Sequence, residues 1–222
     1  MSVRSEIKNT GKEIPMPPKK LVTKQQILDA AMEITRNNGF DAITARSIAA
    51  ELGVSTHPIF TYYSTINEIK DDVLTHARKL YHAHILQGLD ESISFLGIGH
   101  QFLLLARNEP ELFKVLFFKT TPDGRKHADD EFRFTLGLVT DSIMRIYKID
   151  KKTAECYYRN MWLMSLSFAT LIVTGNCTYS DEDMLQILMQ TSLANYKAIK
   201  EIPGFLDGTF DKDKLFTELS LK

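Results

Sequence analysis

The sequence predicts an all-α protein in which a small N-terminal helical unit precedes a larger helical one. Apolar residues recur at three- and four-residue spacing along most of the chain, and no stretch shows the alternation typical of strands. Residues that start and stop helices divide this pattern into separate segments. The 222 residues, 44% hydrophobic and 25% charged, are sufficient for a packed core.

Residues 1–22 are predicted to form a flexible arm, because they contain Pro15, Pro17 and Pro18 and lack a helical repeat. The arm is basic: residues 1–24 carry six Lys or Arg against two Glu, net +4, whereas the whole chain carries −1. A basic arm suits contact with phosphate groups. A solvated tail has the same composition.

The first helix is expected to start after Thr23, which forms a capping box with Gln26. Gly39, which tolerates a positive φ, ends this helix. Thr44 can cap a short second helix, and Gly53 ends it.

Ser55 is expected to cap a third helix that runs through Tyr63, with Pro58 in its first turn, where a missing N–H costs little. A further capping box, Thr65 with Glu68, opens a long fourth helix.

The remaining pattern is helical to near residue 200. Helices are expected at 66–89, 90–107, 109–119, 127–149, 151–175 and 181–200. The chain is thereby divided into the arm 1–22, a helix-turn-helix unit 23–69, a larger helical unit 70–202 and a C-terminal tail 203–222.

The two short helices within 44–63 can cross closely, because Ala49 and Ala50 are small and Gly53 permits a sharp turn. The second helix then presents polar side chains outward: Ser55, Thr56, His57, Thr61 and Tyr62. A recognition helix lying in the major groove of DNA has this geometry. An ordinary helical hairpin has the same spacing.

A set of residues between 38 and 69 follows one longer pattern. Its members are Asn38-Gly39-Phe40, Thr44, Ile48-Ala49, Gly53-Val54-Ser55, Phe60, Tyr62-Tyr63 and Glu68-Ile69. The stretch 23–69 thereby resembles the DNA-binding domain of the TetR family of repressors. The resemblance implies that Thr44 and Tyr62 contact phosphates and that Thr56, His57 and Thr61 lie nearest the base edges.

Two positions depart from the family pattern. His57 stands where members usually have a small residue or Pro, and Ile66 stands where many have a phosphate-binding Lys. We therefore expect Lys19, Lys20 and Lys24, together with helix N-termini, to supply much of the phosphate contact.

The resemblance also implies that 70–202 is a ligand-binding and dimerisation domain. Aromatic and apolar residues are dense from 95 to 172, and the candidates for a pocket are Phe102, Phe113, Phe117, Met144, Tyr147, Trp162 and Phe168. The implied effector is a small apolar or amphipathic molecule. Each of these side chains would also suit an ordinary core.

The last two predicted helices are expected to pair with their copies in a homodimer. The candidates for this interface are Ser165, Ala169, Leu185, Leu188, Met189 and Leu193. Packing within one chain is the alternative. Dimerisation is favoured because helix-turn-helix proteins bind palindromes through two-fold symmetry.

Other classes of site find little support. His76, His82 and His84 do not share one helix face at metal-binding spacing, and no motif for catalysis or a cofactor is present. Cys156 and Cys177 suit a reducing cytoplasm, and no apolar run is long enough for a membrane span.

The sequence therefore predicts a ligand-responsive homodimeric repressor that binds double-stranded palindromic operator DNA. The first alternative is a helical ligand-binding protein of the same type with weak or lost operator binding, which His57 and Ile66 would favour. The second alternative is a helical enzyme or ligand carrier, and no residue in the sequence supports it.

Overall fold

The computed structural model describes residues 22–119 and 127–220, and in these ranges the chain is helical without any strand, which confirms the all-α prediction. The helices are α1 (Lys24–Asn38), α2 (Ala45–Leu52), α3 (Ile59–Tyr62), α4 (Ile66–Gln87), α5 (Ser94–Asn108), α6 (Pro110–Phe117), α7 (His127–Tyr147), α8 (Lys151–Val173), α9 (Asp181–Glu201) and α10 (Lys212–Ser220). Two short 3₁₀ helices, η1 (Phe40–Ala42) and η2 (Gly88–Asp90), follow α1 and α4.

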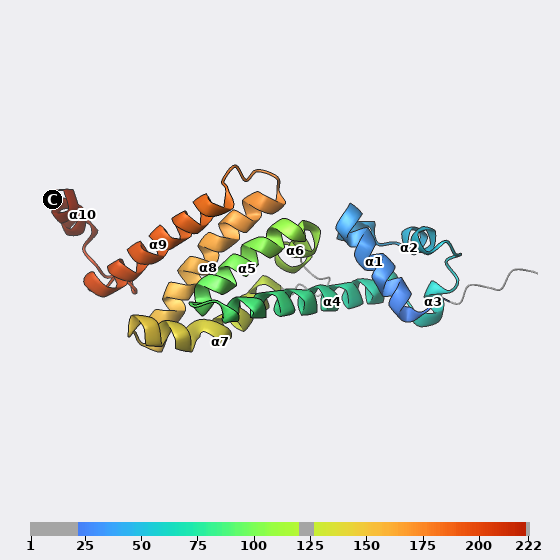
Figure 1. Cartoon of the computed structure of the whole chain (residues 1–222), viewed down its shortest axis with the longest axis horizontal. Coiled ribbons are helices and arrows are strands. Elements are labelled where there is room, and N and C mark those ends of the chain that lie inside the picture. The colour runs from blue at the N-terminus through green and yellow to red at the C-terminus, as the bar shows by residue number, and fades with distance from the viewer. Residues whose placement is uncertain (1–21, 120–126, 221–222) are drawn as a thin grey trace, which may run out of the picture.

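The molecule is elongated, with α1–α3 at one end and α10 at the other (Figure 1). Residues 22–72, hereafter the head, contain α1–α3 and the start of α4. Residues 73–201, the body, contain the rest of α4 and α5–α9. Helix α4 runs lengthwise from the head into the body (Figure 1).

Apolar side chains from four helices hold the head together. Ile27 of α1, Ile48 of α2, Ile59 of α3 and Ile69 of α4 are all fully buried. Burial of such branched side chains stabilises a fold by about 1.5–3 kcal/mol each. The short helices α2 and α3 are therefore held by packing rather than by their own length.

The N-terminal caps follow the sequence closely. Thr23 accepts a hydrogen bond from the Gln26 N–H at 3.2 Å, and the Gln26 side chain accepts from the Thr23 N–H at 2.9 Å. Thr44 accepts from the Ser47 N–H at 3.0 Å and so caps α2. Both predicted caps are confirmed.

The third helix is shorter than predicted. It begins at Ile59 rather than after Ser55, and Pro58 occupies its N-cap without a side-chain hydrogen bond. A turn precedes it, in which the Ile59 N–H donates to the Thr56 carbonyl at 3.2 Å. Proline disfavours helical backbone at the residue before it, so His57 does not extend the helix backwards. The prediction that Ser55 caps this helix is wrong.

Helix α4 is a single continuous helix across residues 69 and 70. Its buried side chains recur every four residues: Ile69, Val73, Ala77, Tyr81 and Ile85. Thr65 caps it by accepting from the Glu68 N–H at 3.3 Å, but the Glu68 carboxylate accepts from the Ser64 N–H at 2.8 Å. Half of the predicted capping box is thus present.

In the body, α5 packs against α4, α8 and η2, and α8 packs against α7 and α9. The contact between η2 and α5 requires glycine at both positions: a Cβ on Gly97 would collide with the Gly88 carbonyl. The expected helix at 90–107 therefore starts later, at Ser94, because η2 and a short bend occupy the residues before it. No helix in the described part of the chain is long and apolar enough to cross a membrane.

Candidate DNA-binding surface and ligand cavity

The exposed surface of the head is built by the turn between α2 and α3. Gly53 ends α2 in the left-handed conformation, with φ of 67° and ψ of 37°. Buried Ile59 and Tyr63 anchor the following segment. The five side chains predicted to face outward, Ser55, Thr56, His57, Thr61 and Tyr62, are all exposed. Their exposure leaves them available to a partner.

Thr44 is exposed at the N-terminus of α2, although its hydroxyl is used in the cap. The free N–H groups of a helix N-terminus, with the partial positive charge of the helix dipole, favour an anion. Thr44 therefore lies where a phosphate would be accommodated.

Two exposed residues near this surface were missed as candidates. Arg46 lies in the first turn of α2 and has no ion pair within the described residues. A cation is unfavourable at a helix N-terminus. An arginine at this position in the sequence therefore indicates a role in binding rather than in stabilising the helix. Phe60 of α3 is 47% exposed. The residues around an aromatic side chain in the sequence do not indicate whether it is exposed, so Phe60 could not be recognised as a surface residue.

Lys24 is engaged within the head rather than free. Its ammonium group lies 3.0 Å from the Asp72 carboxylate and 4.8 Å from the centre of the Tyr63 ring. The Tyr63 hydroxyl donates to the same carboxylate at 2.9 Å. The other two predicted arm residues, Lys19 and Lys20, and the arm up to residue 21 lie outside the described residues. Val22, also assigned to the arm, is buried.

These contacts alter the acidity of the groups involved. Burial disfavours the Asp72 carboxylate, but the hydrogen bonds from Lys24 and Tyr63 outweigh it and hold the pKa of Asp72 below its ordinary value. Burial, reinforced by the bond to Asp72, raises the pKa of the Tyr63 hydroxyl. Asp72 is therefore a carboxylate at neutral pH and Tyr63 a neutral donor.

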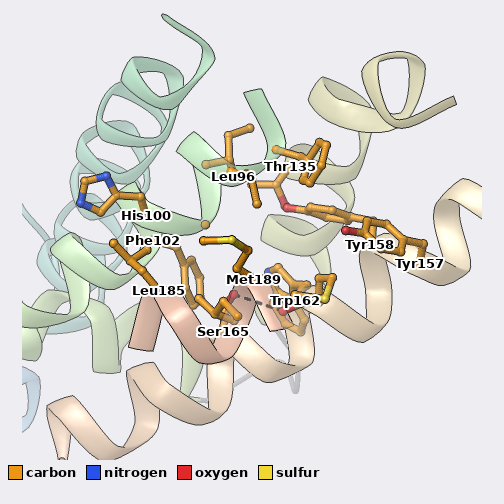
Figure 2. A pocket seen from close by; sticks show the side chains of 15 residues that line it. Leu96, His100, Phe102, Thr135, Tyr157, Tyr158, Trp162, Ser165, Leu185 and Met189 are labelled. Atoms are coloured by element: carbon orange, nitrogen blue, oxygen red, sulfur yellow. Dashed lines mark hydrogen bonds between the residues drawn. The ribbon is translucent and has the colours of Figure 1, made fainter. Parts of the chain in front are cut away.

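The body contains a cavity of about 220 Å³ between α5, α7, α8 and α9 (Figure 2). Helix α5 contributes Phe95, Leu96, Ile98, Gly99, His100 and Phe102. The other helices contribute Thr135 of α7, Tyr157, Tyr158, Met161, Trp162 and Ser165 of α8, and Leu185, Leu188 and Met189 of α9.

Only part of the predicted pocket set lines this cavity. Phe102 and Trp162 do. Phe113 and Phe117 pack against Phe102 instead, with ring centres 5.1 and 5.2 Å from its own, and belong to the core.

The other three pocket candidates also lie outside the cavity wall. The Tyr147 hydroxyl lies 3.1 Å from that of Tyr157, and the Phe168 ring packs edge-on against Tyr179 at 5.8 Å. Met144 packs against the core. Core and cavity walls are both apolar, so residue type alone does not separate them.

The six predicted dimer residues divide equally: three are buried within the chain, and Leu185, Met189 and Leu193 are exposed. Ala169 is fully buried, and Ser165 and Leu188 are buried as well. Ser165, Leu185, Leu188 and Met189 line the cavity. Of the predicted set, Leu193 is exposed, at 67%, and does not line the cavity. Helix α9 carries apolar residues on more than one face, and the sequence does not say which face meets α8.

Buried polar groups around the cavity are mostly paired. The Tyr157 hydroxyl shares a hydrogen bond with Ser192, and Ser165 donates to the Met161 carbonyl at 3.1 Å. Burial raises the pKa of Tyr157 and of Tyr158. Both phenols are therefore neutral. The Trp162 Nε1 is buried and has no hydrogen-bond partner among the described residues.

A cluster of polar side chains around the buried Glu131 joins α4 to α7. The Glu131 carboxylate, 1% exposed, accepts from Arg78 at 2.6 Å and lies 2.7 Å from the His82 Nε2. The His82 ring stacks on Phe134 with centres 3.8 Å apart. The cluster fixes the body half of α4 against its neighbour.

Residues 27–72 match the family model described as bacterial regulatory proteins, tetR family. A solved structure of a Clostridium perfringens protein assigned as a fatty acid metabolism regulator is similar with a TM-score of 0.47 and 16% identity, over 84% of this chain and 100% of that chain. None of the curated proteins matches the sequence. The family match lies entirely within the head.

Proposed function

We propose that this chain, which belongs to the TetR family of bacterial regulatory proteins, is a homodimeric, effector-responsive repressor of a two-fold symmetric operator. The family makes it a DNA-binding transcriptional regulator and not an enzyme. The observation that carries the proposal is the row of exposed side chains that follows the turn at Gly53, on a head anchored by buried Ile59 and Tyr63.

In the proposed complex, this row enters the major groove. Thr56, His57 and Thr61 lie nearest the base edges, where hydroxyl and imidazole groups hydrogen-bond bases. Phe60 adds apolar contact suited to a thymine methyl group.

Phosphate contacts in the proposed complex come from the edges of the same surface. Ser55 and Tyr62 lie at the two ends of the exposed row, and Thr44 lies at the N-terminus of α2. Arg46 supplies a positive charge for a phosphate. Lys19 and Lys20 of the arm are proposed to add further contacts. Lys24 holds Tyr63 and Asp72 in place, and its side chain, 55% exposed, is proposed to contact a phosphate as well.

The cavity is the proposed effector site. Phe102, which lines it, packs edge-on against Tyr81 of α4 with ring centres 6.5 Å apart. A ligand that displaces Phe102 therefore acts on the helix that carries the head. To change operator affinity, it must bind one arrangement of α4 better than the other.

The proposed dimer forms through the outer faces of α8 and α9. Leu163 of α8 and Leu193 of α9 are large exposed apolar residues there. Pairing two copies sets two heads against the two halves of a palindrome.

The test is a fluorescence-anisotropy titration with DNA that flanks the gene for this protein. We expect a Kd of about 10⁻⁸ M at physiological salt, and binding at least about 10³-fold weaker to scrambled DNA. Arg46→Ala should weaken binding to all sequences and lower the salt slope by about one. Arg145→Ala, which removes an exposed arginine of α7, is the matched control and should change neither.

Binding that does not distinguish flanking from scrambled DNA, in a protein with a native helical spectrum, would contradict the operator proposal. It would support the alternative of a ligand-binding protein that has lost operator recognition. If the Arg46 and Arg145 variants changed DNA affinity and its salt dependence equally, the proposed phosphate contact of Arg46 on α2 would be contradicted.

A further inference from the structure

The cavity is not closed by a single chain. Leu96 of α5 and Leu185 of α9 are each 39% exposed and Met189 of α9 is 64% exposed, although all three line the cavity (Figure 2). Sites for small molecules usually bury most of the surface of their ligand. A molecule bound beside these three side chains would keep part of its surface in water. The cavity therefore lacks a wall at this mouth.

Two of the residues at the mouth belong to a longer apolar stripe on α9. Leu185, Met189 and Leu193 are all exposed and follow one another at four-residue spacing, which places them along one face of the helix. No residue from Met184 to Tyr196 is charged. These three residues, hereafter the α9 stripe, form a continuous exposed apolar surface, which is typical of a site for a partner.

The two ends of the α9 stripe carry opposite charges. Glu182 precedes Leu185 by three residues and Lys197 follows Leu193 by four, so both lie on the same face of the helix, and both are exposed. Glu182 has no ion pair among the described residues, and the Lys197 ammonium group is 3.9 Å from the Glu201 carboxylate. The partner that fits this face therefore offers an apolar stripe between a cation and an anion.

A second copy of α9, running antiparallel, offers that arrangement. A two-fold axis at Met189 places Met189 against its own copy and Leu185 against the partner's Leu193. The same axis brings the partner's Lys197 within one residue of the position opposite Glu182. A two-fold interface requires such self-complementarity. A parallel pair would instead set like charges against each other.

Resting on the proposed role of the cavity as the effector site, we propose that a second copy of this chain closes it. Helix α9 pairs with its copy about a two-fold axis at Met189, and the partner's Leu193 covers the mouth beside Leu185. Each effector site is thus built from two chains. A ligand that reaches the mouth contacts both copies, so it binds the dimer better than the monomer.

The first test is disulfide cross-linking of the full chain after Cys156→Ser and Cys177→Ser. Met189→Cys should give a covalent dimer on mild oxidation, because its two thiols meet at the axis. Leu185→Cys/Leu193→Cys should also cross-link. Leu185→Cys alone is the matched control and should not, because its two copies lie eight residues, about 12 Å, apart along the helix and beyond the reach of a disulfide. Non-reducing electrophoresis distinguishes the products.

The second test measures whether the partner covers the mouth. Trp162 lines the cavity, whereas Leu193 does not line the cavity of its own chain. Leu193→Glu should therefore increase the quenching of Trp162 fluorescence by acrylamide, through loss of the partner. Phe216→Glu, at an exposed apolar residue of α10, is the matched control and should leave the quenching unchanged. Circular dichroism establishes that both variants are folded.

Each outcome bears on a different part of the inference. If Met189→Cys does not cross-link in protein that sediments as a dimer and binds its operator, the axis is elsewhere, and this inference fails while the proposed function stands. Cross-linking without a change in quenching in Leu193→Glu would show that α9 pairs but leaves the cavity open. A monomeric wild type would contradict the proposed dimer itself.

Discussion

At the scale of single residues, Asp72 joins three segments of the head through one carboxylate. Its carboxylate forms an ion pair with Lys24, the first residue of α1, and accepts a hydrogen bond from the hydroxyl of Tyr63, which directly follows α3. Its pKa lies below the ordinary 3.8. The stability it contributes is therefore complete above that value and is lost as pH falls through the lower, folded-state pKa.

Asp72→Asn should destabilise the protein at pH 7 and have progressively less effect as pH falls below 4. The expected loss at pH 7 is less than about 1 kcal/mol, because the carboxylate is 38% exposed and solvent screens the pair. Urea unfolding of both proteins across this pH range measures it. A difference that stays constant with pH would assign the effect to packing rather than to charge.

At the scale of elements, the turn after α2 decides where α3 lies. Gly53 has φ of +67°, and a Cβ there would meet no atom within 4 Å. Gly53→Ala is therefore expected to destabilise by about 1–2 kcal/mol through backbone strain alone. It should also weaken operator binding, because the strain is relieved by moving α3.

Gly137 provides the matched control for that prediction. It lies within α7, is exposed, and its Cβ would likewise meet no atom within 4 Å, but its φ is not positive. Gly137→Ala should stabilise by about 1 kcal/mol through helix propensity. Chemical denaturation of the two variants should thus give opposite signs, and a shared sign would argue against strain at Gly53.

Local chemistry explains which elements could be predicted from the sequence. The caps at Thr23 and Thr44 and the stop at Gly53 depend on residues within a few positions, so their signals are present in the sequence itself. The start of α3 was missed because Pro58 acts on the backbone before it, and only the packed turn shows where the helix resumes.

The candidate sites divide in the same way. The five outward-facing side chains on the head were predicted, although three of them lie in the turn before α3 rather than in the helix, and exposed Phe60 and Arg46 were missed. The cavity wall was predicted only at Phe102 and Trp162, because which aromatics meet empty space depends on how α5, α8 and α9 pack. Leu185 and Met189 line the cavity and are also exposed, so their place in a dimer interface stays a prediction.

At the scale of the whole molecule, α4 links the two proposed sites. Its 22 residues span about 33 Å without a break. Ile69 packs in the head, whereas Arg78 and His82 are held by Glu131 in the body. A tilt of this helix against α7 would therefore move the head as a unit, and the contacts of Arg78 and His82 with Glu131 limit that tilt.

The proposed dimer gives a prediction at this scale. The wild-type chain should sediment as a dimer, and the double variant Leu163→Glu/Leu193→Glu as a monomer, with association at least about 100-fold weaker because charges would be buried unpaired. Phe216→Glu, at an exposed apolar residue of α10, should leave the dimer intact. A monomeric wild type in analytical ultracentrifugation would rule out this interface.

Trp162 has a practical consequence. It is the one tryptophan in the sequence, and it stands in the cavity wall, far along the chain from the head. Its intrinsic fluorescence is therefore an optical signal from the body alone, free of any label. If operator DNA changes that emission, binding at the head alters the surroundings of Trp162. The factor by which DNA changes ligand affinity then equals the factor by which the ligand changes operator affinity.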